Sequence, residues 1–350
     1  MKILITGNMG YVGPGVIINL RNSFPEAEIV GYDTGYFAKC LTNAAYFPDV
    51  PLNQQIFGDV RNFPSSLLKG VDVVIYLAAI SNDPMGNKYE EVTMEVNCHS
   101  ALRMAELAKK EGTKSFIFAS SCSIYGAADD APKKEGDSLN PLTAYARSKV
   151  AAEEGLAKLA DDNFLVTCFR FATACGFSSR LRLDLVLNDF VAGAITSKEI
   201  SILSDGTPWR PLINVKDMAR AIDFGIIRKS ANGGKFLAVN TGSKYWNYQV
   251  VELAEMVAKI IPGTKVSVNK NAAPDKRSYK VNFDLYEKLA PNHQPEYSLE
   301  TTVLDLYKNL LGMNFSDPNY RSSELIRLQV LNNLQENKLL SETLHWNWKK

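Results

Sequence analysis

Short apolar runs alternate with longer segments of helical periodicity through the first half of the chain. The runs are rich in β-branched and aromatic residues, which favours strands, and they cover residues 3–6, 28–32, 55–58, 72–77, 115–119 and 164–170. The segments between them are long enough for helical crossovers, most clearly at 88–110 and 143–160. Such alternation predicts an α/β fold made of βαβ units around a buried parallel sheet.

The pattern becomes less regular after Phe171, with loops, shorter helices and two further strand-like runs at 212–215 and 236–240. We therefore expect two domains, 1–172 and 173–350, with segments near 212–242 returning to the first. The last thirty residues carry leucines at positions 325, 328, 331 and 334. This helical spacing predicts an amphipathic helix that packs on the smaller domain.

Composition narrows the class of protein. A length of 350 residues suits two domains, and 46% apolar with 22% charged residues is typical of a globular chain. The net charge of +1 offers no basic field, so nucleic-acid binding is not expected. The longest strongly apolar run, residues 73–80, is far shorter than the roughly 20 residues of a membrane span, and we expect no membrane insertion.

The N-terminus and the cysteines indicate a compartment. The opening residues MKILITG are too short for the apolar core of a signal peptide. Five cysteines without a CxxC pair, together with only three histidines, argue against a disulfide framework and a zinc site. We expect a reduced, cytoplasmic protein without a bound metal.

A glycine-rich segment follows the first predicted strand. Gly7, Gly10 and Gly13 are spaced by three residues, and a helix-compatible run follows. Glycines there would permit a tight turn, the approach of a pyrophosphate to the helix N-terminus, and close packing of helix on strand. The second predicted strand ends at Asp33, where a carboxylate would bind ribose hydroxyls and repel a 2′-phosphate. The segment predicts a dinucleotide site that favours NAD over NADP.

A second motif places Tyr145 and Lys149 on one face of the predicted helix 143–160. About one such pair is expected by chance in this length, so its weight comes from the preceding strand, which ends near Ser121. Ligands bind at the carboxyl ends of parallel strands. A tyrosine is a poor base at neutral pH, and a nearby lysine with the positive nicotinamide ring would favour its phenolate. Ser121 would hold the substrate oxygen. Without the serine at the strand end, the Tyr145 and Lys149 pair would indicate only a surface tyrosine and a solvated lysine.

Together these motifs resemble the extended short-chain dehydrogenases/reductases, in the branch of sugar-nucleotide epimerases and dehydratases. The resemblance covers nearly the whole length and rests on the glycine segment, Asp33, Gly58-Asp59-Val60, Leu77-Ala78-Ala79, Asn97, SSCSIYG at 120–126, Tyr145 and Lys149. It implies a Rossmann-type doubly wound parallel sheet with a smaller, mixed C-terminal substrate domain. It also implies NAD as cofactor, a nucleotide-diphosphate sugar as substrate, and a homodimer formed through helices 88–110 and 143–160.

The resemblance implies roles for individual residues. Ser121 would be the catalytic hydroxyl, with Ser123 ranked second. Asp59 and Val60 would meet the adenine, and Asn97 would support the helix near the nicotinamide. The full set of expected cofactor residues is Gly7, Gly10, Tyr11, Val12, Gly13, Asp33, Asp59, Val60, Leu77, Ala78, Ala79, Asn97, Tyr145 and Lys149.

The second half of the chain matches more loosely. Arg210, Asn188 and Arg277 fall where the family places contacts to the nucleotide diphosphate, and arginine suits that task because its planar fork bonds phosphate oxygens in pairs. Thr173 stands at the sugar pocket, where many members have an asparagine. For Arg180, Arg182 and Lys276 we expect a solvated surface position as readily as substrate contact.

The implied first step is oxidation of a sugar hydroxyl, at C4, with Tyr145 as base. A 4,6-dehydratase of this family would carry an Asp-Glu pair directly after the catalytic hydroxyl, and this chain has Cys122 and Ser123 there. Epimerisation through a transient ketone is therefore the leading hypothesis, and a C4-dehydrogenase or a dehydratase is the alternative. A non-catalytic NAD-sensing protein is a weaker alternative, because the Ser, Tyr and Lys set is complete.

Overall fold

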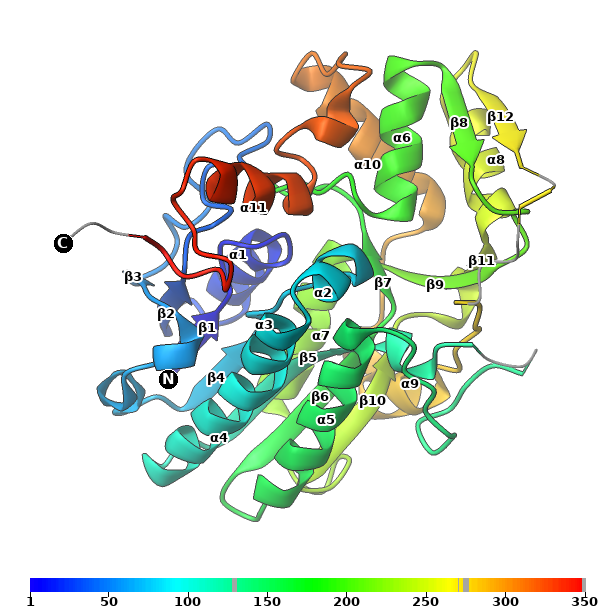
Figure 1. The fold of residues 1–350 in the computed structure, drawn as a ribbon. Helices are drawn as coiled ribbons and strands as arrows, with labels where there is room; N and C mark the ends of the chain where they lie inside the picture. Colours follow the sequence, from blue (N-terminus) through cyan, green and yellow to red (C-terminus); the bar gives the residue numbers. More distant parts are fainter. Residues whose placement is uncertain (128–130, 270, 273–276, 348–350) are drawn as a thin grey trace.

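A seven-stranded parallel sheet forms the centre of the computed structural model, which describes residues 1–127, 131–269, 271–272 and 277–347 (Figure 1). The strand order is β10-β6-β5-β4-β1-β2-β3. The strands are β1 (Lys2–Thr6), β2 (Glu28–Asp33), β3 (Gln54–Phe57), β4 (Val73–Tyr76), β5 (Ser115–Ser121), β6 (Leu165–Phe171) and β10 (Phe236–Thr241). The predicted α/β fold with a Rossmann-type doubly wound sheet is confirmed.

Helices cover both faces of this sheet. One face carries α1 (Gly13–Ser23) and α7 (Val215–Ile227), and the other carries α3 (Glu90–Met94), α4 (Ser100–Lys110) and α5 (Ala144–Leu159). Along β1, Ile3 and Ile5 belong to the apolar cluster of the first face, whereas Leu4 belongs to that of the second. Because both faces are covered, a central strand such as β4, with the sequence Val-Val-Ile-Tyr, is apolar and buried at every position rather than alternating.

The helix predicted at 88–110 is divided in the structure. α2 (Asp83–Lys88) ends before Tyr89, α3 follows, and a π-helical turn at Glu95–His99 leads into α4. π turns are often found at functional sites, and this one carries Asn97. The helix predicted at 143–160 is found as α5, and the Thr143 hydroxyl caps it by accepting a bond from the Ala146 N–H at 3.2 Å.

The smaller layer combines helices with two short sheets. α6 (Val186–Thr196), α8 (Val250–Ile260) and α10 (Leu299–Gly312) pack with the pair β8 (Glu199–Ile202) and β12 (Lys265–Val268) around a third apolar cluster. A three-stranded sheet contains β7 (Thr173–Cys175), β9 (Trp209–Asn214) and β11 (Asn247–Gln249), and α9 (Asp284–Leu289) lies against β10. The expectation that both late strands rejoin the main sheet is wrong for β9, because β10 occupies the edge beside β6.

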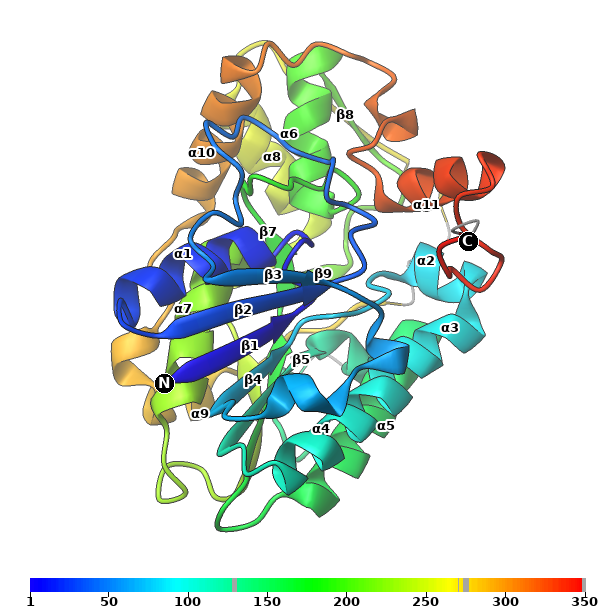
Figure 2. The same ribbon diagram turned by 90° about the vertical axis from the view of Figure 1, so that its left-hand side faces the viewer.

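The C-terminal helix α11 (Arg327–Glu336) packs on a different partner from the one expected. Its Leu331 joins the apolar cluster of the α3–α5 face, and Tyr89 donates a hydrogen bond to Gln335 at 2.7 Å. Figure 2 shows α11 beside α2 and α3. The expected packing on the smaller domain is wrong for α11, because leucine spacing defines an apolar face and not the surface that it meets.

Three features bear on the compartment and metal expectations. All five cysteines are buried and unpaired. Among the described residues, no helix combines the length and the apolar character needed to cross a bilayer. Within the same residues, no group of histidine, cysteine and carboxylate side chains has the arrangement of a metal site.

Candidate active site

A large cavity of about 1060 Å³ opens at the carboxyl ends of the sheet. The chain proceeds from β1 outward to β3 on one side and from β4 outward to β10 on the other, so the direction of winding changes between β1 and β4. Open parallel sheets bind ligands at such a switch point. The cavity is slightly larger than the usual range for one small ligand, about 300–1,000 Å³.

The glycine segment forms one wall of the cavity at the switch point. Gly7 has φ +74°, and a Cβ there would lie 2.5 Å from the backbone nitrogen of Ala78, which follows β4. At Gly13 a Cβ would lie 1.8 Å from the carbonyl oxygen of Asn8. Gly7, Gly10, Tyr11 and Val12 line the cavity, whereas Gly13 lies behind them at the start of α1. A side chain would clash with the backbone at both Gly7 and Gly13. At Gly7 it is therefore the backbone that faces the cavity.

Two carboxylates stand at the ends of β2 and β3. Asp33 accepts bonds from the backbone N–H groups of Met9 at 2.9 Å and Gly35 at 2.7 Å, while burial raises its pKa. Asp59 accepts bonds from the guanidinium of Arg61, the shortest at 2.6 Å. Both carboxylates line the cavity. Val60, Leu77, Ala78 and Ala79 line it as well.

Asn97 acts from behind the cavity wall. It is fully buried, its amide nitrogen donates to the Ile80 carbonyl and the Ser148 hydroxyl, both at 3.0 Å, and its oxygen accepts from the Ile80 N–H at 2.9 Å. The Ser148 hydroxyl in turn donates to the Tyr145 carbonyl at 2.7 Å. Asn97 therefore ties the loop after β4 to the helix that carries Tyr145.

Ser121, Tyr145 and Lys149 all line the cavity. Ser121 is the last residue of β5, and its hydroxyl accepts from the Ser123 N–H at 3.1 Å. The Lys149 ammonium donates to the Ala119 carbonyl at 2.7 Å and lies 5.6 Å from the centre of the Tyr145 ring. The strand end and the helix thus bring the hydroxyl, the phenol and the ammonium to one place.

Burial shifts the pKa of both groups of the helix motif. The pKa of Tyr145 is raised to about 12, mainly by burial and against the influence of the Ser121 hydroxyl and Arg182. The pKa of Lys149 is lowered to about 7, again mainly by burial. Each charge alone is disfavoured in this environment, so a phenolate and an ammonium form most readily together.

A buried polar cluster around Arg182 and Asp184 forms another part of the cavity wall. Arg182 donates to both oxygens of Asp184, at 2.8 and 3.0 Å, and to the hydroxyl and carbonyl of Ser81, at 2.8 and 3.1 Å. Asn82 donates to Asp184 at 2.8 Å and has φ +138°, a backbone conformation that an asparagine rarely adopts. Strained residues of this kind persist where the surroundings hold them, often at active sites.

Sequence reasoning missed this cluster. Of the two positions considered for Arg180 and Arg182, the solvated surface is wrong, since both are buried and Arg180 pairs with Asp49 at 2.6 Å. Arg182 lines the cavity. Lys276 lies outside the described residues. The available signal was the position of Ser81-Asn82-Asp83, one residue after Leu77-Ala78-Ala79, at a strand end that meets the switch point.

The expected substrate residues divide into two groups. Ser123, Thr173, Arg210 and Arg277 line the cavity, and Arg277 pairs with Asp83 at 2.7 Å. Asn188 is fully buried outside the lining, where its amide bonds to the Gly176 N–H at 2.9 Å and to the Arg182 carbonyl at 2.8 Å. In this structure Asn188 supports the loop that carries Arg182.

The sequence was compared with those of known families. Residues 3–242 match the NAD dependent epimerase/dehydratase family. The chain belongs to this family. It is an NAD-dependent enzyme family, so the predictions of an enzyme, of NAD as cofactor and of the sugar-nucleotide epimerase/dehydratase class are confirmed at that level.

Individual relatives differ in activity. The chain is 25% identical to an uncharacterized UDP-glucose epimerase of Bacillus subtilis over 74% of this chain and 82% of the relative. It is 27% identical to UDP-glucuronic acid decarboxylase 3 of Arabidopsis thaliana over 80% of each. A solved UDP-glucuronic acid 4-epimerase of Bacillus cereus, in complex with UDP-glucuronic acid and NAD, superimposes with a TM-score of 0.75 at 23% identity, over 89% of this chain and 99% of that one.

Proposed function

We propose that the protein is an NAD-dependent epimerase that inverts C4 of a nucleotide sugar through a transient 4-keto intermediate. One observation carries this proposal. The Ser121, Tyr145 and Lys149 side chains line one cavity, while neither of the two residues directly after Ser121 is a carboxylate. Cys122 follows instead, and it is fully buried with its thiol on the Arg170 carbonyl at 3.0 Å.

The residues around the glycine segment fit the cofactor. The backbone surface at Gly7 and Gly10 leads to the N-terminus of α1, which suits a pyrophosphate. Asp33 and Asp59 would hold the adenosine, and Leu77, Ala78 and Ala79 would lie along the dinucleotide. When bound, NAD supplies the acceptor for a hydride from the sugar and, as NADH, the donor that returns it.

The residues of this chain would manage the proton. Lys149 would balance the Tyr145 phenolate, because burial disfavours either charge alone. The phenolate oxygen would take the proton of the sugar hydroxyl and become a neutral phenol. The Ser121 hydroxyl would donate a hydrogen bond to the forming ketone oxygen. The same three groups would return the proton when hydride arrives on the opposite face of the sugar.

The far side of the cavity would hold the sugar and its diphosphate. Arg210 and Arg277 are cations at the lining, and each could bond phosphate oxygens in pairs. Thr173 and Ser123 would face the sugar. The Ser123 oxygen is buried and has no hydrogen-bond partner among the described residues, which fits a role in contacting a substrate.

Dehydration and decarboxylation leave different products from inversion. The experiment is to incubate the protein with NAD and a panel of UDP- and dTDP-sugars, then to record product masses and NMR spectra. Inversion gives an unchanged mass with a new spectrum and no accumulation of NADH. Loss of water, loss of carbon dioxide, or loss of two hydrogens with stoichiometric NADH would each overturn the proposal in favour of a dehydratase, a decarboxylase or a dehydrogenase.

Two further proposals concern the context of the enzyme. We propose a homodimer through α4 and α5, which lie side by side on one face of the sheet (Figure 1). A single monomer mass in light scattering at micromolar concentration would contradict it.

We also propose a cytoplasmic location, which is supported by five buried cysteines in the reduced state.

A further inference from the structure

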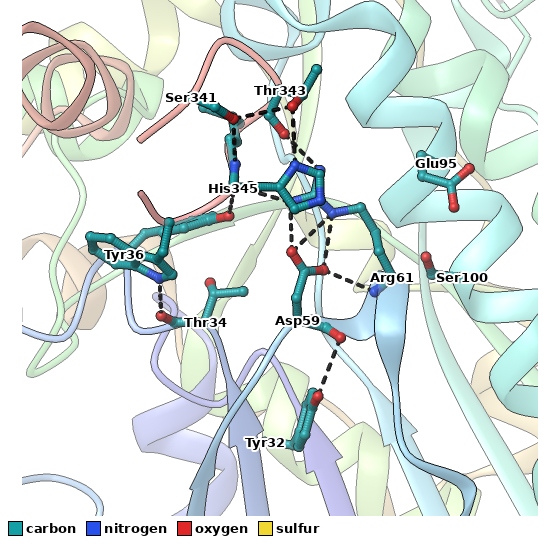
Figure 3. Close-up of polar contacts among 12 residues, drawn as sticks. Tyr32, Thr34, Tyr36, Asp59, Arg61, Glu95, Ser100, Ser341, Thr343 and His345 are labelled. Carbon is teal, nitrogen blue, oxygen red and sulfur yellow. Dashed lines mark hydrogen bonds and ion pairs between the residues drawn. The ribbon is translucent and has the colours of Figure 1, made fainter. Parts of the chain in front are cut away.

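The chain returns to the cavity after α11. Residues 339–347 form a compact loop that is closed by an antiparallel bridge between Leu340 and Trp346. Leu344, near its tip, is fully buried and lines the cavity. Figure 3 shows this loop beside Asp59 and Arg61. We call residues 339–347 the C-terminal clasp.

Arg61 joins the clasp to the end of β3. Its guanidinium donates to the carbonyl oxygens of Thr343 at 2.6 Å and Leu344 at 2.9 Å. The same guanidinium donates to both carboxylate oxygens of Asp59, at 3.0 and 2.6 Å. A planar arginine fork can serve both sides at once, which a lysine cannot. The position of Asp59 is therefore linked to the clasp through one side chain.

A second set of contacts joins the clasp to the residues after β2. The Tyr36 hydroxyl donates to the Leu344 carbonyl, and the Trp346 indole N–H donates to the Thr34 carbonyl at 2.8 Å. The Trp346 and Tyr36 rings also pack together, with their centres 5.5 Å apart. Thr34 and Tyr36 line the cavity close to Asp33 in the chain. The clasp thus spans the ends of β2 and β3.

Leu344 is held in an unfavourable backbone conformation. Its φ is +58°, in the left-handed region that favours glycine. Such a conformation persists when neighbouring groups fix it, and here the Leu344 carbonyl accepts hydrogen bonds from both Arg61 and Tyr36. The two hydrogen bonds to the Leu344 carbonyl and the burial of its side chain therefore outweigh the cost of this backbone conformation.

We propose that the C-terminal clasp completes the adenosine end of the NAD site and slows the release of NAD. The clasp is fastened beside Asp33 and Asp59, the two carboxylates that would hold the adenosine, and it contributes Leu344 to the cavity wall. This inference rests on NAD as cofactor and deepens the proposed function. An epimerase returns hydride to the sugar that it has oxidised, so its cofactor must stay bound between the two transfers.

The test measures the release of NAD directly. The protein is loaded with radiolabelled NAD, mixed with excess unlabelled NAD, and sampled for retained label over time. A chain that ends at Lys338 lacks the clasp, and a chain that ends at Asn347 is the matched control that keeps every contact named above. If the clasp slows release, the chain that ends at Lys338 should release NAD at least about tenfold faster than the full-length protein, and the chain that ends at Asn347 should release it at the same rate.

A second variant guards against misfolding of the shortened chain. Trp346→Ala keeps Leu340 and Leu344 but removes the indole bond to Thr34 and the ring contact with Tyr36. It should release NAD several-fold faster while the circular dichroism spectrum stays that of the parent protein. If neither Trp346→Ala nor the folded shorter chain releases NAD faster, the clasp proposal is overturned.

The clasp and the proposed reaction can fail separately. If the sugar assay yields an oxidised or dehydrated product while NAD release still depends on the clasp, the reaction proposal falls and the clasp stands. If the sugar is inverted while NAD release is the same with and without residues 339–347, the clasp falls and the reaction stands.

Discussion

The two sides of the cavity are built in different ways. The glycine side takes its residues from the ends of neighbouring strands, so sheet register alone brings Gly7, Asp33 and Ala78 together. The part of the wall that contains Arg182 and Arg277 depends on contacts between distant segments, such as Arg182 with Ser81, 101 residues apart, and Arg277 with Asp83, 194 residues apart. We call the glycine side the cofactor wall and the other side the sugar wall, after their proposed ligands. The comparison teaches that the cofactor wall follows from the order of the strands, whereas the sugar wall follows from individual long-range pairs.

The largest expected effect is at the point where the two sides meet. Tyr145→Phe removes the proposed base while leaving both walls in place, so turnover should fall by about 10³-fold. NAD affinity, measured by fluorescence titration, should change little. Tyr125→Phe is the matched control, because its phenol is buried outside the cavity lining and bonds to Asn240 at 2.7 Å. It should lower the melting temperature and keep turnover, and full activity in Tyr145→Phe would contradict the proposed chemistry.

The second effect tests the sugar wall. Arg182→Met removes the ion-pair partner of buried Asp184 and leaves it the hydrogen bond from Asn82, so the free energy of unfolding should fall by about 3–5 kcal/mol. Arg277→Met breaks an ion pair whose arginine is about half exposed, so it should cost less than about 1 kcal/mol. Urea unfolding measures both. Equal losses of stability in the two variants would show that the difference in burial between the two ion pairs does not affect their contribution.

The third effect tests the cofactor wall. Gly7→Ala would place a Cβ 2.5 Å from the Ala78 backbone at φ +74°, and should destabilise the protein by about 3 kcal/mol and weaken NAD binding. Gly70→Ala has nearly the same φ, +70°, with no atom within 4 Å of the added Cβ, so only the strain of about 1 kcal/mol remains. Thermal unfolding and NAD titration of both variants separate the effect of the close contact with Ala78 from that of backbone strain. Equal losses of stability in the two variants would show that the close contact has no effect.

The smallest effect concerns the choice of dinucleotide. Asp33→Asn removes the charge that would repel a 2′-phosphate, so the ratio of NADP to NAD dissociation constants should fall by about tenfold. Asp72→Asn is the control, since Asp72 precedes β4 and accepts from the Lys2 N–H at 2.8 Å. Its ratio should match that of the parent protein. An unchanged ratio in Asp33→Asn would place the discrimination elsewhere.

The cofactor wall and the main sheet could be predicted from the sequence because their signals are local. Apolar runs gave the strands, glycine spacing gave the turn after β1, and helical spacing put Tyr145 and Lys149 on one face. The sugar wall could not be predicted this way. A lone Arg182 in the sequence is a surface residue by default, and only the fold brings Ser81 and Asp184 around it.

The same limit applies to the partners of regular elements. The leucines of α11 define an apolar face, but the residues that receive it, such as Tyr89, lie more than 200 positions earlier. The strand-like run at 212–215 was expected to return to the main sheet, yet β9 pairs with β7 and β11, and the position beside β6 belongs to β10. In both cases local pattern specified the element, and competition among distant segments specified its place.

The contact between Arg61 and Leu344 also has a consequence in time. The two residues are separated by 283 positions, which a ribosome adding about 5–20 residues per second covers in roughly 15 to 60 s. During that interval Asp33, Asp59 and Arg61 have already been synthesised while the segment that fastens onto them has not. The hydrogen bonds from Arg61 and Tyr36 to the Leu344 carbonyl are therefore among the last contacts at this part of the cavity that the chain can form during its synthesis.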